Sequence, residues 1–130
     1  MIPPLIAEHA EKLRRLHPGL RITEMPSGVA QAVLVEVPDV ELPDAWNRPT
    51  TTVRFLVPLA YPAAPPDSFW ADAGLALRDG RPPQGSRVQP LPGSAEPLLW
   101  FSWHVQQWNP NVHTVSSFLQ VVKNRFRTPQ

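Results

Sequence analysis

Ser102 and His104 are the two side chains of this sequence whose types and spacing suit acyl transfer. A serine hydroxyl is weakly nucleophilic and needs an adjacent base to accept its proton. In an extended segment, side chains two positions apart point to the same side, so His104 would be placed as that base. A positioned histidine base contributes about 10²–10⁴ in rate, which is enough for a serine acceptor. The pair therefore predicts a serine nucleophile with a histidine base.

Other interpretations of these residues stay open. Ser94 is a second, more distant hydroxyl, and His113 is an alternative base directly before a predicted helix. In a purely structural interpretation, Ser102 is a small residue between two tryptophans and His104 is an ordinary surface or core histidine. The sequence does not choose between the catalytic and the structural interpretation.

The other histidines and the absence of cysteine predict no metal site and no cofactor. The four histidines have no paired ligand spacing, and His9 and His17, on or after the first predicted helix, are assigned no chemistry. A chain without cysteine forms no disulfide, zinc–thiolate site or iron–sulfur cluster.

Length, charge and hydropathy limit the class of protein. A chain of 130 residues is expected to form one domain over residues 1–130. Its net charge of +1, from 12 basic and 11 acidic residues, argues against nucleic acid or an anionic membrane as a partner. No stretch reaches the roughly 20 apolar residues of a membrane helix, and the N-terminus lacks a charged signal-peptide region. The sequence therefore predicts a cytoplasmic protein.

The candidate pair must be positioned by helices and strands. Pro3 and Pro4 suit the first turn of a helix whose apolar residues recur at helical spacing, and residues 17–19 (His-Pro-Gly) end it. The apolar residues of that helix are Ile6, Ala10, Leu13 and Leu16. Strands are expected at residues 20–25, 29–37, 50–59 and 69–70, with Pro38 ending the second.

The second half of the chain contains a long loop and a final helix. Residues 74–97 are rich in glycine and proline without periodicity, so we expect a loop there. Thr114 is the expected N-cap of an amphipathic helix. The apolar residues of this helix are Val115, Phe118, Leu119, Val122 and Phe126. Trp100, Phe101, Trp103 and Trp108 precede this helix, and we expect at least two of the tryptophans to pack in the core.

Three motifs in this order resemble the ubiquitin-conjugating enzyme (UBC) fold. They are Tyr61-Pro62-x-x-Pro65-Pro66 after a strand, Trp108-x-Pro110, and the amphipathic helix that follows Thr114. The stretch Trp-Phe-Ser-Trp-His at 100–104 is similar to prokaryotic family E of this superfamily. The resemblance implies an α+β domain with an N-terminal helix and a four-stranded antiparallel meander in the order 1-2-3-4. The Tyr-Pro crossover, a long loop and a C-terminal helix packed on the sheet complete the expected fold.

The crossover motif also makes a local prediction. Proline fixes φ and lacks the N–H donor, so this segment cannot be a central strand. We expect Tyr61 to be largely buried with its hydroxyl bonded to nearby backbone, in a segment where proline allows a cis peptide bond.

The sequence departs from the family pattern at the chemistry. The family's cysteine position falls at Trp100, which cannot carry an acyl group, and Ser102 is the nearest hydroxyl. The family's His-Pro-Asn motif is not recognisable, so Asn109 or backbone N–H groups are the candidates for stabilising an oxyanion.

The resemblance implies a role in a bacterial ubiquitin-like conjugation pathway. An activating-enzyme partner would hand the C-terminal glycyl group of a ubiquitin-like protein to Ser102, as an oxyester that is then passed to an amine of a protein target. No cofactor is implied, because adenylation would belong to the activating enzyme. The alternative is an inactive UBC variant that serves as a scaffold for a ubiquitin-like protein, its activating enzyme, or both.

Overall fold

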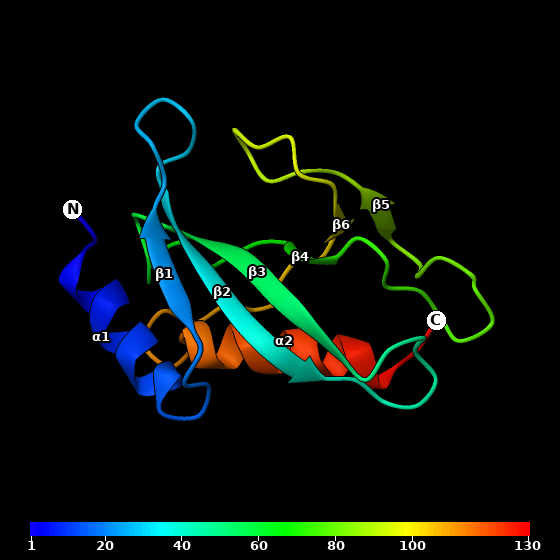
Figure 1. The fold of residues 1–130 in the computed structure, drawn as a ribbon. Helices are drawn as coiled ribbons and strands as arrows, with labels where there is room; N and C mark the ends of the chain where they lie inside the picture. Colours follow the sequence, from blue (N-terminus) through cyan, green and yellow to red (C-terminus); the bar gives the residue numbers. More distant parts are fainter.

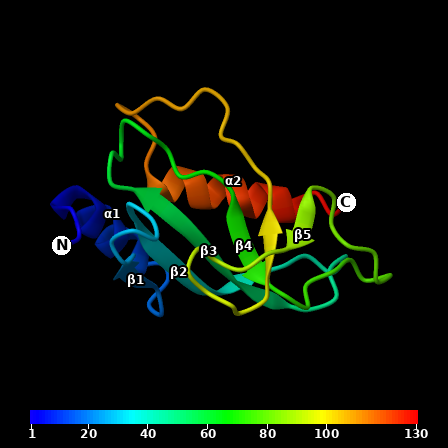
Figure 2. The ribbon, with the colours of Figure 1, turned by 90° about the horizontal axis from the view of Figure 1, so that it is seen from above.

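The computed structural model describes residues 1–130 and shows two helices and one six-stranded antiparallel sheet (Figure 1). The elements are α1 (Pro4–Arg14), β1 (Arg21–Glu24), β2 (Ala32–Glu41), β3 (Thr50–Pro58), β4 (Phe69–Asp72), β5 (Ser86–Val88), β6 (Leu98–Phe101) and α2 (Val115–Arg127). Figure 2 shows α2 lying across one face of the sheet, with α1 beside the β1 edge. This is the expected α+β architecture with its two helices. Neither helix is long and apolar enough to cross a membrane.

The prediction of a four-stranded sheet was wrong, because the sheet has six strands in the order β1-β2-β3-β4-β6-β5. The order of the first four strands is confirmed. The two added strands are β5 and β6. β5 lies inside residues 74–97, where only a loop was expected, and it pairs with β6 from Ser86↔Phe101 to Val88↔Leu99. A three-residue edge strand in a glycine- and proline-rich stretch is too short to show a periodic pattern of apolar residues. It can be recognised only from its hydrogen bonds to β6.

The second strand does not end at Pro38. It begins at Ala32 and continues to Glu41, with a shift in its register against β3 between Val37 and Val40. Asp39, inside the shift, has a φ of 55°. A bulge is one of the few places where a strand tolerates proline, since the ladder hydrogen bond is already lost there.

The core lies between α2 and the sheet. The Phe118 ring of α2 lies 5.0 Å from that of Phe55, and Phe69 stacks on Phe101 with 4.7 Å between centroids. All five apolar residues predicted for α2 are buried. Of those predicted for α1, only Leu16 is exposed, at 79%, because the helix ends at Arg14. Burying each such phenylalanine stabilises the fold by about 1.5–3 kcal/mol.

Tyr61 is buried, as expected, with 6% of its surface exposed. Its hydroxyl accepts a hydrogen bond from the Val115 backbone N–H at 3.0 Å and lies 2.6 Å from His9 Nδ1. Burial raises the pKa of the Tyr61 hydroxyl above its ordinary value, against the opposing hydrogen bond from Val115. The Tyr61–Pro62 peptide bond is cis. The crossover is therefore fixed to both helices at one side chain.

Candidate functional site

The candidate site begins where β6 ends. β6 lies between β4 and β5, and Ser102 is the first residue after it. The Ser102 N–H donates to the Gly85 carbonyl at 2.9 Å, which extends the β5–β6 ladder by one bond. The Ser102 side chain is exposed and its Oγ makes no hydrogen bond. Ser102 is thus held by its backbone and free at its hydroxyl.

Exposure alternates along the next residues. Ser102 and His104 are exposed, whereas Trp103 and Val105 are partly buried and pack against the core. This alternation is typical of an extended chain, in which residues two apart share a side and are separated by roughly 6.6 Å. The alternation indicates that Ser102 and His104 face the same side, although no hydrogen bond joins them. Their chemical roles stay a prediction.

His104 contacts Asp67, a residue that the sequence reasoning did not identify. His104 Nδ1 lies 2.6 Å from Asp67 Oδ1, and 69% and 57% of the two side chains are exposed. One residue away, the buried Ser68 donates its N–H to the Trp103 carbonyl at 2.8 Å. Asp67 precedes His104 by 37 residues and belongs to no spacing motif, so only the three-dimensional contact reveals the pair.

The alternative residues are engaged within their own loops. His113 Nδ1 accepts the Asn109 N–H at 2.9 Å, and Asn109 Oδ1 accepts the Asn111 N–H at 3.0 Å. A neutral His113 with Nδ1 as acceptor carries its proton on Nε2 and has no nitrogen left to act as a base. Ser94 Oγ accepts the Glu96 N–H at 3.1 Å and so closes a turn. These contacts favour His104 over His113 and Ser102 over Ser94.

The aromatic residues of this region have different surroundings. Phe101 belongs to the core, with 1% exposure. Trp100 is partly buried, and the Arg87 guanidinium lies over its ring at 4.8 Å from the centroid. The Trp108 indole N–H donates to the Pro62 carbonyl at 2.8 Å, which fixes the Trp-x-Pro motif to the crossover. Trp100 therefore occupies a strand position, and the hydroxyl that follows β6 is Ser102.

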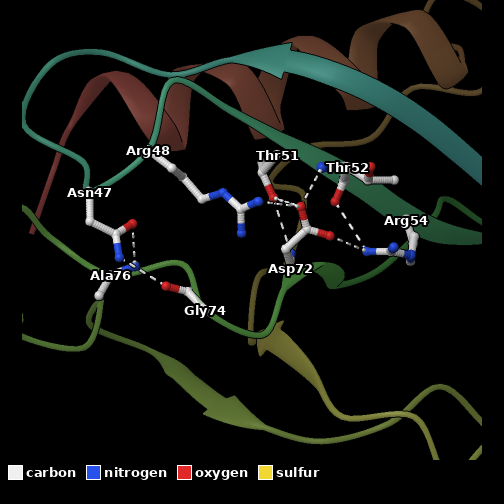
Figure 3. A network of polar contacts seen from close by, with 8 residues as sticks. All are labelled: Asn47, Arg48, Thr51, Thr52, Arg54, Asp72, Gly74 and Ala76. Atoms are coloured by element: carbon white, nitrogen blue, oxygen red, sulfur yellow. Dashed lines mark hydrogen bonds and ion pairs between the residues drawn. The ribbon is translucent and has the colours of Figure 1, made fainter.

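A second polar cluster lies at the other end of β4 from Asp67 (Figure 3). Asp72 accepts hydrogen bonds from Thr51 Oγ1 and the Thr52 N–H, both at 3.1 Å, and pairs with Arg54 at 3.2 Å and with Arg48 at 3.6 Å. Burial alone would raise the pKa of the Asp72 carboxyl, but the bonds from Thr52, Arg54 and Thr51 outweigh it and lower that pKa. With its oxygens engaged, this carboxylate holds β3 and β4 together.

One hollow of the surface has neither Ser102 nor His104 in its lining. A cavity of about 510 Å³ lies between the end of α1, the end of β2 and the last turns of α2. Its lining includes His17, Asp39 and Lys123. No group of three or more acidic or histidine residues lies close enough to hold a metal ion.

The fold is that of a UBC-like domain. It combines α1, an antiparallel sheet, a Tyr-Pro crossover, and α2 lying across the sheet. The sequence model of prokaryotic E2 family E matches residues 12–128, so this chain belongs to that family, and it does so without a cysteine. Comparison with curated proteins gave no match, and neither did comparison with solved structures. Membership places the chain among E2-like proteins, which generally work with a ubiquitin-like protein and its activating enzyme.

Proposed function

We propose that this domain carries the C-terminal glycyl group of a ubiquitin-like protein as an oxyester on Ser102 and passes it to an amine of a protein target. The observation that carries the proposal is the free Ser102 hydroxyl at the end of β6, on the same side of an extended segment as the exposed His104. Family membership supplies the class of reaction and of partner.

The two half-reactions balance with His104 as the proton acceptor and donor. In loading, Ser102 Oγ attacks the activated glycyl carbonyl and His104 takes the hydroxyl proton; the bond from this carbonyl to the activating enzyme breaks, and the leaving group receives the proton from His104. In transfer, the target amine attacks the oxyester carbonyl, the bond to Oγ breaks, and His104 passes the proton lost by the amine to Oγ. The Ser102 N–H cannot stabilise the oxyanion without leaving the Gly85 carbonyl.

Reconstitution with the activating enzyme and the ubiquitin-like protein from the same genome tests this proposal. The loaded species should survive reducing agent and be cleaved by strong base and by hydroxylamine, as an oxyester is. Ser102→Ala should abolish it, whereas the matched variant Ser94→Ala should not. Ser102→Cys should convert it to a species that reducing agent releases, because a thioester exchanges with thiols. Persistence of the adduct in Ser102→Ala would contradict the proposed acceptor.

Replacing His104 should slow the acyl-transfer chemistry and leave noncovalent partner binding unchanged. His104→Ala removes the base and should slow loading by about 10²–10⁴-fold, while noncovalent affinity for the ubiquitin-like protein stays within about twofold. Discharge of the loaded domain to free lysine, followed by intact mass, measures the second half-reaction.

A scaffold role is the second candidate, and the missing cysteine together with the absence of a Ser102–His104 hydrogen bond favours it. A scaffold would bind the ubiquitin-like protein or the activating enzyme and form no adduct. The reconstitution therefore separates the two candidates, since binding without any base-labile adduct supports the scaffold alone.

A further inference from the structure

The contact between His104 and Asp67 joins two segments that are far apart in sequence. Asp67 follows the Pro65-Pro66 end of the crossover, and His104 lies in the extended segment after β6. The 2.6 Å distance between Nδ1 and Oδ1 is that of a direct hydrogen bond between the imidazole and the carboxylate. Neither side chain has a second ion-pair partner, so each is available to the other alone.

The backbone beside this pair is fixed, which limits the entropy lost in forming it. The Ser68 N–H bonds to the Trp103 carbonyl at 2.8 Å, one residue along from Asp67 and from His104. Ser68 is buried and has a φ of 60°, and the preceding Pro66 is also buried. Pro66 has a restricted φ on one side of Asp67, and the hydrogen bond from Ser68 to Trp103 restrains the backbone on the other side. The backbone of Asp67 is therefore held beside that of His104.

A carboxylate in this position determines which nitrogen of His104 carries the proton. An ionised carboxylate only accepts hydrogen bonds, so it selects the tautomer with the proton on Nδ1. The Nε2 lone pair is then free to accept a proton. Because His104 shares a side with Ser102, the Nδ1–H tautomer is the one whose Nε2 can accept the proton of the Ser102 hydroxyl.

We propose that Asp67 is a positioning residue that holds His104 in the Nδ1–H tautomer and so makes Nε2 the base for Ser102. This inference rests on the proposed function. Asp67 touches no reacting atom and acts only through His104. The Tyr-Pro crossover then contributes to the chemistry as well as to the fold, because Asp67 directly follows its last proline, Pro66.

Substitutions at position 67 separate this role from that of a surface ion pair. Asp67→Asn can turn its amide NH₂ toward Nδ1 and select the wrong tautomer, whereas Asp67→Ala leaves His104 free to adopt both. Loading of Ser102 should therefore be slower in Asp67→Asn than in Asp67→Ala, and slower in both than in the parent. We expect about a 10–100-fold loss for Asp67→Asn, below the ~10⁴ of a buried triad, because both side chains face water. Asp67→Glu, which keeps the charge, should recover part of the rate.

The tautomer can be measured without any reaction. Nitrogen-15 spectra of the labelled domain at a pH where the rings are neutral distinguish Nδ1–H from Nε2–H, and His104→Gln identifies the His104 signals. The parent should show the Nδ1–H form, and Asp67→Asn should shift it toward Nε2–H. Asp79→Asn is the matched control, since Asp79 forms an exposed ion pair with Arg81 at 2.7 Å elsewhere in the chain.

The outcomes are distinct. The expected rate order together with the tautomer change supports the positioning role. An Asp67→Asn rate equal to or above that of Asp67→Ala, or an unchanged tautomer, overturns it even when Ser102→Ala abolishes the adduct and the proposed function stands. Adduct formation by Ser102→Ala refutes the proposed function, and the role of Asp67 in that reaction is refuted with it.

Discussion

The Tyr61 hydroxyl and the Val115 backbone N–H are 3.0 Å apart, so one hydrogen bond joins the crossover to the first residue of α2. The first N–H groups of a helix have no partner within the helix, and a buried one needs another acceptor. Because the Tyr61 hydroxyl accepts this bond, it can donate its own proton to His9 Nδ1 on α1. One side chain thus contacts both helices.

Tyr61→Phe should lower the free energy of unfolding by about 1–3 kcal/mol, because the buried Val115 N–H loses its acceptor while the ring stays. Urea denaturation followed by tryptophan fluorescence measures the change. His9→Phe tests the second contact, and a double-mutant cycle with Tyr61→Phe should show coupling, since the two side chains share a hydrogen bond. Unchanged stability in Tyr61→Phe would contradict this account of the crossover.

Ser102→Ala should leave the free energy of unfolding within about 0.5 kcal/mol of the parent, because the Ser102 side chain is exposed and its hydroxyl has no partner in the fold. Denaturant midpoints of the parent and of Ser102→Ala, measured beside the loading assay, should be equal. Loss of the adduct would then come from the missing hydroxyl and not from unfolding. A large loss of stability would mean that the hydroxyl has a structural partner and would remove the basis for using this variant.

Sequence patterns predicted those parts of the fold in which local and tertiary preferences agree. The N-cap at Thr114 and the buried stripe of α2 follow from helical periodicity, and the burial of Tyr61 follows from the proline motif around it. β5 could not be predicted, because its pairing with β6 creates it. Asp67 could not be predicted either, since its contact with His104 depends on where the crossover ends in space. Ser102 and His104 could be proposed from the sequence because their spacing is local, and their roles stay a prediction.

The Asp72 cluster gives a pH dependence whose sign can be worked out. The folded-state pKa of Asp72 lies below its ordinary value of 3.8, so the folded state binds fewer protons than the unfolded state as pH falls through this range. This stabilising contribution is present above about pH 4 and is lost as pH falls through the folded pKa. Asp72→Asn should therefore be less stable than the parent at neutral pH, with the difference shrinking in acid. Urea midpoints from pH 7 to pH 2 measure this, and a constant difference would contradict it.

Arg125 of α2 should fix the segment before β5 that supplies the hydrogen-bond acceptor of the Ser102 N–H. Its side chain is 4% exposed and donates to the carbonyls of Gln84 at 3.0 Å and Thr128 at 2.9 Å, and burial lowers its pKa. Gln84 precedes Gly85, whose carbonyl accepts the Ser102 N–H. Arg125→Met leaves these partly buried carbonyls without their charged donor and should destabilise the fold by about 1.5–3 kcal/mol.

The same substitution should act locally on the candidate site. Hydrogen exchange of the Ser102 amide should accelerate more in Arg125→Met than exchange in β2 and β3, because the segment that supplies its acceptor is released first. Arg127→Met, at an exposed position in the same turn of α2, is the control and should change neither stability nor exchange appreciably. Equal acceleration throughout the sheet would show global destabilisation and refute a specific link between Arg125 and Ser102.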